Sequence, residues 1–568
     1  MKPSNSSIMV LSRKITFISS IMLTVALLEF PSQYTYSYNV LQSWEMLGQN
    51  APIFSAVFFA WISSVFFFVY TSKSKAGRIE LLASNLLVVV FTGFWTLRTN
   101  SPIPKVDGTQ AFSFISAVLS HGHLVLTNSY QWSLYTVWPL PTYFVSATSR
   151  IMGMGLDQTM IVTILILDQA TCTLLFLFFC RVLGSPKLGF TALCIFWVGG
   201  IYNQSSTFTP TVYGFPLLVG LLLVTIGVFQ SRRGTLRILP IFVILSIALA
   251  LGHFISALMF LGIIMIVALA MARQTRIMIY GAVVAMLTVA VPVAYSELEV
   301  NFLASSIKGI LQNPFLQFHE AYISKIGSQL PQWVSSITLG WQIVMIIPVV
   351  SAVFVVLVMR ESLPRNIYFV CLMAIGLVLS GSFLVLGGVG YALSILGYLP
   401  LVSAPVIVAL VSRHSQYRQF GLILVVALLV GASFPTFIAY NRTQELYQVN
   451  EYDLSLYKFI QSSVPGSGVT LYTSWDNYLP YVNNFSLVYI DLSPTATPAS
   501  LWYQWNTTLN QFANAGSQTR VMLFSERDIV PWEAQIGVKS SDPHWNTIRG
   551  DLAAFDKVFV NRYGALYV

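Results

Sequence analysis

Long apolar segments separated by short charged turns constrain this chain more than any other feature. Residues 211–230 and 254–272, for example, contain no acidic or basic side chain. About twenty apolar residues in a helix cross the hydrocarbon core of a bilayer. Of the 568 residues, 55% are hydrophobic and 9% are charged, whereas a soluble protein has about a quarter charged residues. The sequence therefore predicts an integral membrane protein made of many helices.

Hydrophobic runs of this kind recur along the first three quarters of the chain. We predict about thirteen spanning segments. Their approximate bounds are 14–31, 52–72, 80–97, 158–180, 188–202, 211–230, 237–252, 254–272, 277–296, 338–359, 366–387, 391–412 and 419–440. The fifth is short, and only a tight turn at Gly252 and His253 separates the seventh from the eighth.

The distribution of lysine and arginine predicts the orientation of these spans. With the N-terminus in the cytoplasm, 17 of the 30 basic residues lie in cytoplasmic loops that are nearly all short. Basic residues in short loops determine which side stays inside. The net charge of +9 is thus explained by topology, and no basic face with interleaved aromatic residues indicates a nucleic-acid partner. We predict a multi-pass cell-membrane protein whose C-terminal part is extracytoplasmic.

This topology places three longer regions outside: 98–157, 297–337 and 441–568. The half-hydrophobic segment 139–153 lies within the first of them. If this segment crossed the membrane, every later loop would change sides and the arginine-rich loops would face outward. We therefore expect a helix that lies at the outer interface or re-enters the membrane.

The composition changes abruptly at residue 441. Short β-rich runs occur near 468–472, 487–490, 521–524 and 557–560, and the segments 451–463 and 499–513 have the periodicity of amphipathic helices. This alternation predicts a small extracytoplasmic α/β domain. The predicted fold is thus a polytopic α-helical membrane protein with two N-terminal helices in 1–79, a main module in 80–440 and an α/β domain in 441–568.

Residues that could hold a metal are sparse. All four cysteines lie inside apolar runs, and His121 and His123 lack the spacing of a zinc motif. We predict no metal site from these residues, and leave open whether the protein uses a divalent metal.

The order of features in the first external loop resembles a known family. A span is followed by an acid, Asp107, then by a helix-like stretch at 111–119, and then by Trp138-Pro139-Leu140 and the interfacial segment. Phe208-Thr209-Pro210…Tyr213-Gly214-Phe215-Pro216 and Gly252-His253-Phe254-Ile255-Ser256 add to the likeness. This pattern is similar to the GT-C superfamily of polytopic glycosyltransferases, and the resemblance covers about 80–440.

The resemblance implies an inverting enzyme that moves a sugar from a polyprenyl-phosphate donor to an acceptor outside the cytoplasm. The acceptor is a glycan, a lipid or a protein. Family members place an essential acid in this loop, which implies Asp107 as the catalytic residue. Arg98, Lys105 and His253 are candidates for binding the donor phosphate. His319 and Glu320 are candidates for the acceptor side.

Each candidate also has a structural interpretation. Asp107 and Gly108 form a common turn pair, and Asp107 could cap the helix that follows. Arg98 could be a snorkelling anchor, and His253 could satisfy backbone groups at its turn. Asp168 lies in the middle of a span, so it must be protonated, paired or facing a cavity.

Two other functions stay open at this point. A transporter or flippase for a lipid-linked sugar would need charged groups along a path through the membrane, and only Asp168 fits. A catalytically inactive scaffold would use the C-terminal domain as a binding module. Ser474-Trp475-Asp476-Asn477-Tyr478 partly resembles the Trp-Trp-Asp-Tyr-Gly motif of oligosaccharyltransferases, but it lacks one tryptophan and has an asparagine before the tyrosine.

Overall fold

The computed structural model describes the helices of the membrane module and the sheet near the C-terminus. The described residues are 56, 59–70, 77–96, 139–199, 210–230, 238–270, 345–354, 364–386, 397–412, 469–473, 486–489, 498–514, 519–525, 543–560 and 564–567, with isolated positions between 111 and 122, between 279 and 308, and at 459 and 463. The predicted spans 14–31 and 419–440 lie outside these ranges.

Apolar helices are present where the sequence predicts spans. They are α3 (Arg78–Thr96), α7 (Leu156–Leu183), α8 (Pro186–Gly199), α10 (Pro210–Gln230), α11 (Leu239–Gly252), α12 (Phe254–Ala270), α17 (Arg365–Leu386) and α19 (Pro400–Ser412). In the part of the chain that is described, three helices are long and apolar enough to cross a membrane, within α7, α10 and α17. The molecule is therefore a helical membrane protein, and the number of spans stays a prediction.

Proline marks the start of many of these helices. Helices α8, α10 and α19 begin at Pro186, Pro210 and Pro400. Proline suits the first turn because its fixed φ is helical and its missing N–H would have no partner there. The predicted span at 391–412 therefore contains a helix that begins at Pro400. At the other end of α7, Gly184 adopts φ 69° and its N–H donates to the Cys180 carbonyl oxygen, which closes the helix.

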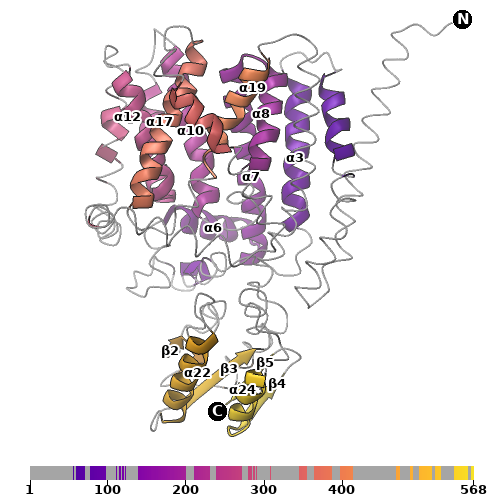
Figure 1. Ribbon diagram of the computed structural model, residues 1–568, viewed down its shortest axis with the longest axis vertical. Helices are drawn as coiled ribbons and strands as arrows, with labels where there is room; N and C mark the ends of the chain where they lie inside the picture. Colours follow the sequence, from indigo (N-terminus) through magenta and orange to yellow (C-terminus); the bar gives the residue numbers. More distant parts are fainter. Residues whose placement is uncertain are drawn as a thin grey trace, which may run out of the picture.

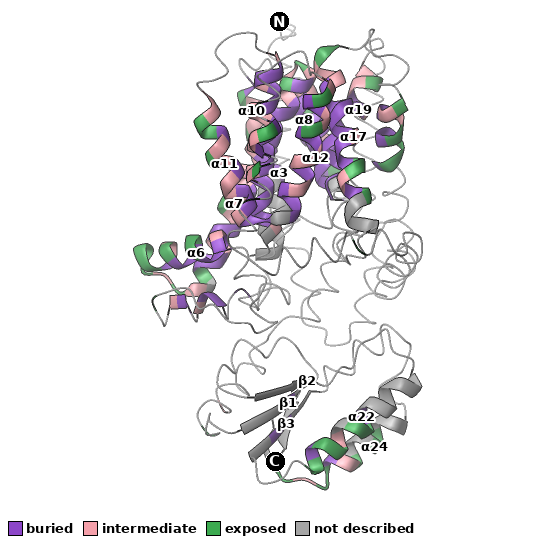
Figure 2. Ribbon diagram, turned by 90° about the vertical axis from the view of Figure 1, so that its left-hand side faces the viewer, coloured by how far each residue is buried: buried purple, intermediate pink, exposed green. Residues whose placement is uncertain are grey.

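The helices pack around one large apolar core, which is drawn purple in Figure 2. The tightest pair is α12 with α17. A side chain at Gly376 would place its Cβ 2.5 Å from the Cα of Ile263 and 2.8 Å from the Gly262 carbonyl oxygen. Ser380 Oγ donates to the Leu258 carbonyl oxygen at 3.1 Å. Small residues thus allow the two backbones to touch, as is common between membrane helices.

A shorter helix, α6 (Pro139–Met152), lies across one end of the bundle (Figure 1). Val145 of α6 packs with Phe114 and Ile115, with Met160 and Ile164 of α7, and with Tyr213 of α10. Arg150 donates from Nη2 to the Leu119 carbonyl oxygen at 2.9 Å. Residues 111, 114–116, 118 and 119 are helical. The predicted first-loop helix and the predicted helix at 139–153 are therefore confirmed, and both lie at the same end of the bundle.

The C-terminal residues form a five-stranded sheet with the order β2-β1-β3-β5-β4. Its strands are β1 (Val469–Thr473), β2 (Ser486–Tyr489), β3 (Thr519–Ser525), β4 (Lys557–Val560) and β5 (Gly564–Tyr567). The strands β2, β1 and β3 are parallel, whereas β5 is antiparallel to both β3 and β4. In Figure 1 the sheet lies beyond the end of the bundle where α6 is found.

Two helices accompany this sheet, α22 (Pro498–Ala513) and α24 (Pro543–Leu552). Tyr472 of β1 meets Phe512 of α22 edge-to-face with ring centroids 5.1 Å apart. Trp505 of α22 donates to Asp551 of α24 at 3.3 Å. The four predicted strands and the helix at 499–513 are confirmed, whereas β5 and α24 were not predicted. The predicted helix at 451–463 lies almost entirely outside the described residues.

Candidate functional site

His253 lies at a break between two apolar helices. Its backbone is extended, with φ −165° and ψ 101°, and its N–H donates to the Leu249 carbonyl oxygen at 2.8 Å to end α11. Its own carbonyl oxygen accepts from the N–H of Ala257 in α12. The side chain is only 4% exposed. The break therefore directs an imidazole into the protein interior, where its nitrogens need polar partners.

Hydroxyl groups provide those partners. Nδ1 of His253 lies 2.7 Å from Ser256 Oγ, and Nε2 lies 3.4 Å from Thr211 Oγ1. Ser256 Oγ in turn lies 2.7 Å from the hydroxyl of Tyr398, which is also buried. A hydroxyl can donate and accept at once, so either tautomer of the imidazole fits this chain. The polar chain of Thr211, His253, Ser256 and Tyr398 connects α10, the α11–α12 break and the turn before α19.

A glycine allows these elements to approach. A Cβ at Gly214 in α10 would collide with Cβ of His253 and lie 3.0 Å from Ser256 Oγ. The next residue, Phe215, packs against Tyr398 with ring centroids 5.6 Å apart. The two sequence motifs around Gly214 and His253, which are about forty residues apart, therefore meet in the structure. Any side chain larger than hydrogen at position 214 would push them apart.

Helix α6 lies against the same region. Leu140 of α6 is 3.6 Å from where a Cβ on Gly252 would be, and Phe144 meets the ring of Tyr213 edge-to-face at 6.1 Å. Gly252 precedes His253, and Tyr213 precedes Gly214. The first-loop helix, α6, the start of α10 and the α11–α12 break therefore converge at one end of the bundle, which we call the α6 end.

The structure does not describe the other five site residues that the sequence predicts. Asp107, Arg98, Lys105, His319 and Glu320 lie outside the described residues. The first described helical residue after Asp107 is Ala111, which belongs to the buried cluster at the α6 end. The roles of all five residues stay predictions, as does phosphate binding by His253, whose ring is enclosed by protein hydroxyls. Among the described residues no group of three metal-ligating side chains is found.

Asp168 lies on α7 and is 4% exposed. Its Oδ2 has no hydrogen-bond partner among the described residues. One turn further along, the thiol of Cys172 donates to the Ser84 carbonyl oxygen on α3 at 3.3 Å. The sequence requires Asp168 to be protonated, paired or facing a cavity. A pairing partner for Asp168 is not seen in the described part of the chain.

Sequence reasoning missed two members of the polar chain. Tyr398 precedes α19 by two residues and is 142 positions from Ser256, so no local pattern connects them. Thr211 is one of several hydroxyl residues near the start of α10. Ser256 was noted as the hydroxyl residue that follows the histidine.

Comparisons with known proteins give little further identification. No protein-family model matches the chain, and no curated protein matches it. Among solved structures, the chain is similar to the crystal structure of ArnT from Cupriavidus metallidurans bound to undecaprenyl phosphate. The TM-score is 0.45 and the sequence identity 11%, over 86% of this chain and 97% of that chain. A likeness at this level assigns neither fold family nor activity.

Proposed function

We propose that this protein is an inverting glycosyltransferase of the GT-C type, which transfers a sugar from a polyprenyl phosphate to an acceptor outside the cytoplasm. The observation that carries the proposal is the convergence at the α6 end. The helix that follows Asp107, the interfacial helix and the two motifs around Gly214 and His253 all come together there. These are the same segments on which the sequence resemblance rests.

The chemistry requires few groups. A hydroxyl of the acceptor attacks the anomeric carbon, the bond from that carbon to the phosphate oxygen breaks, and polyprenyl phosphate leaves with the electron pair. The phosphate is already a good leaving group, so an acid on that side is not needed. Asp107 would take the proton from the acceptor hydroxyl as a general base. Arg98 and Lys105 would neutralise the phosphate by charge-assisted hydrogen bonds.

The polar chain of Thr211, His253, Ser256 and Tyr398 would hold the segments next to this site in place. His253 is fixed by hydroxyls on both nitrogens, and the chain connects three segments of the bundle. Its contribution to phosphate binding would pass through Thr211, which lies at the first turn of α10. Backbone N–H groups at the start of a helix favour negative charge. His319 and Glu320 would contact the acceptor.

The decisive test replaces Asp107 by asparagine, which keeps the size and removes the charge. Transfer from a polyprenyl-phosphate sugar would be measured in reconstituted membranes. Loss of a general base typically lowers the rate by about 10²- to 10⁴-fold. Binding of the donor lipid should persist, because the phosphate ligands are other residues. Asp556→Asn, on an exposed residue between α24 and β4, is the matched control and should transfer at the wild-type rate.

A flippase for a lipid-linked sugar is the second candidate, and the buried Asp168 favours it. A flippase moves the intact glycolipid between leaflets and forms no glycosidic bond. Liposomes that contain the protein and a fluorescent polyprenyl-phosphate sugar would separate the two functions. Exchange between leaflets without any glycosylated acceptor would exclude the transferase, and full transfer by Asp107→Asn would remove this residue from the mechanism.

A further inference from the structure

Hydroxyl side chains in the helices of this protein follow a consistent pattern. Eight of them donate to the carbonyl oxygen four residues earlier, at 2.7–3.0 Å. This group consists of Ser84, Thr148, Thr159, Thr173, Thr191, Thr225, Ser246 and Ser403. Serine and threonine satisfy themselves in this way when no better partner is near. A buried hydroxyl that does not do so is therefore turned toward something else.

Three buried serine and threonine hydroxyls at the α6 end differ from all of these. Thr142 and Ser146 lie on α6 and Thr163 lies on α7, with exposures of 0%, 8% and 1%. The oxygen of each is buried and has no hydrogen-bond partner among the described residues. Leaving a buried hydroxyl unsatisfied is costly, and in native proteins such a group usually meets water or a ligand.

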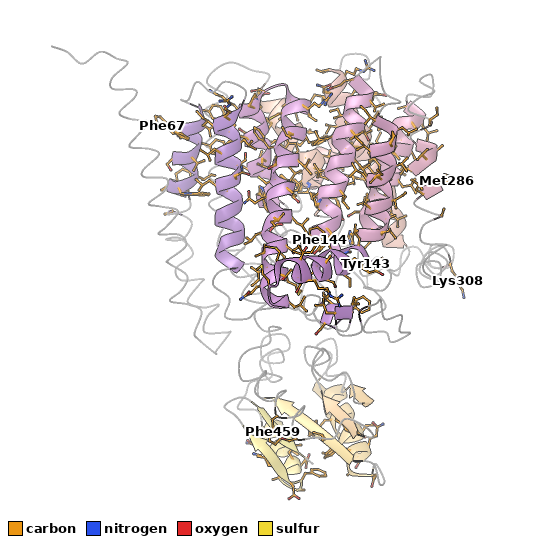
Figure 3. All side chains as sticks on the ribbon, turned by 180° about the vertical axis from the view of Figure 1, so that it is seen from behind. Phe67, Tyr143, Phe144, Met286, Lys308 and Phe459 are labelled. Carbon is orange, nitrogen blue, oxygen red and sulfur yellow. The ribbon has the colours of Figure 1, made fainter. Side chains whose placement is uncertain are left out.

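The three hydroxyls lie in one layer. Thr142 and Ser146 are one helical turn apart on the buried face of α6. Val145, between them, belongs to the same buried cluster as Ile164, the neighbour of Thr163 on α7. Figure 3 shows the side chains of α6, with Tyr143 and Phe144 labelled, where the helix crosses the end of the bundle. The three hydroxyls therefore lie where the buried face of α6 packs against the bundle.

Their chemistry selects the kind of ligand. A hydroxyl donates one hydrogen bond and accepts up to two, which matches the hydroxyls of a sugar ring. A phosphate would instead require cations or several N–H groups. The basic residue on α6, Arg150, is exposed, unlike the three hydroxyls, and donates to the Leu119 carbonyl oxygen. A neutral polyhydroxyl group thus fits this layer better than an anion does.

We propose that Thr142, Ser146 and Thr163 form the seat for the sugar of the lipid donor, beneath α6. This inference rests on the proposed function and adds the position of the sugar within it. The seat would contribute to recognition of the sugar, because a site that hydrogen-bonds substrate hydroxyls discriminates against ligands that lack them.

The test compares two ligands on the full-length protein in detergent. One is bare polyprenyl phosphate, and the other is a panel of polyprenyl-phosphate hexoses and pentoses. Affinities would be measured by native mass spectrometry. The variants are Thr142→Val, Ser146→Ala and Thr163→Val, alone and combined, which remove each hydroxyl with little change in shape. The controls are Thr148→Val on the exposed side of α6 and Thr159→Val on α7, whose hydroxyls donate to carbonyl oxygens.

We expect the wild-type protein to bind at least one glycosylated lipid more tightly than the bare lipid. The combined variant should lose about tenfold or more of that affinity, as expected for losing two or more hydrogen bonds, and bind the bare lipid within about twofold. The controls should keep both affinities. If the combined variant does not fold, the single variants carry the test, each with a smaller loss for the glycosylated lipid alone.

Other outcomes would overturn the proposal in distinguishable ways. Equal binding of glycosylated and bare lipid by the wild-type protein would exclude the sugar seat and leave a lipid-phosphate enzyme standing. Equal losses for both ligands in the variants would show that the hydroxyls support the fold or the phosphate. Failure of the wild-type protein to bind any polyprenyl phosphate would exclude the proposed function together with the seat.

Discussion

The α12–α17 interface and the α6 end show two opposite ways of packing helices in this protein. Between α12 and α17, glycines bring the backbones into contact, and Ser380 donates to a carbonyl oxygen of the partner helix. At the α6 end, Thr142, Ser146 and Thr163 are buried but make no hydrogen bond with the described residues. The serine hydroxyl between α12 and α17 thus has a hydrogen-bond partner within the protein. The three hydroxyls at the α6 end can still form hydrogen bonds with another group.

This difference indicates how the molecule divides stability from function. Without a hydrophobic driving force between helices in lipid, close packing of small residues supplies much of the association energy. A region that binds a polar ligand must instead carry polar groups that stay unsatisfied until the ligand arrives. Substitutions in the two regions should therefore have opposite consequences for stability and for binding.

The largest expected effect on stability comes from Gly376→Ala. The added methyl group would overlap the backbone of Ile263, so α12 and α17 must separate. Overpacking of this kind costs about 1–3 kcal/mol and occasionally more, and we expect the upper part of that range. The control is Gly220→Ala in α10, where the nearest atom would be 4.0 Å away. Thermal unfolding in detergent would compare them, and equal midpoints would show that the helices do not meet at Gly376.

A smaller effect on stability is expected at the polar chain, where Gly214 allows a close approach of helices and buried hydroxyls form hydrogen bonds. Tyr398→Phe removes the hydroxyl that meets Ser256 and should cost about 1 kcal/mol. Ser256→Ala and the double variant complete a cycle, and the two effects should not add, because the residues share one hydrogen bond. Tyr368→Phe, on a half-buried tyrosine of α17, is the control. Additive losses would show that Tyr398 and Ser256 act independently.

The smallest effect is expected at Asp168. A buried carboxyl group without a partner is expensive in a membrane, so Asp168→Leu should leave the stability unchanged or raise it. If the residue is structural, Asp168→Asn should keep sugar transfer within about tenfold of the wild-type rate. Both quantities would be measured on the same preparations. A large loss of lipid exchange or transfer in Asp168→Asn would assign this acid a functional role and favour the flippase.

The sequence predicted the helices well because a hydrophobic run of about twenty residues has few alternatives in a membrane. It also predicted α6, since a span at 139–153 would have inverted every later loop. Strand β5 was missed because it begins with Gly564 and Ala565, two residue types that are depleted in strands. Tyr398 was missed because its partner is distant in sequence, and a tyrosine beside an apolar helix looks like any other core residue.

The candidate site was predicted less completely than the fold. Local motifs identified His253 and Ser256 but gave no information on which hydroxyls their side chains reach. The three unsatisfied hydroxyls were not predicted, because burial and hydrogen bonding depend on how α6 packs against α7. Asp107, the proposed catalytic residue, lies outside the described residues, so its role rests on the sequence resemblance.

Pro216 makes the first turns of α10 easier to deform than the rest of the helix. Because proline has no N–H, the carbonyl oxygen of Val212 receives no helical hydrogen bond from position 216. Gly214, two residues earlier, adds backbone freedom. The segment that carries Thr211 and Tyr213 is therefore more compliant than the remainder of α10. Local opening there would break fewer hydrogen bonds than opening elsewhere in the helix. The start of α10 can thus deform locally while the rest of the helix keeps its hydrogen bonds.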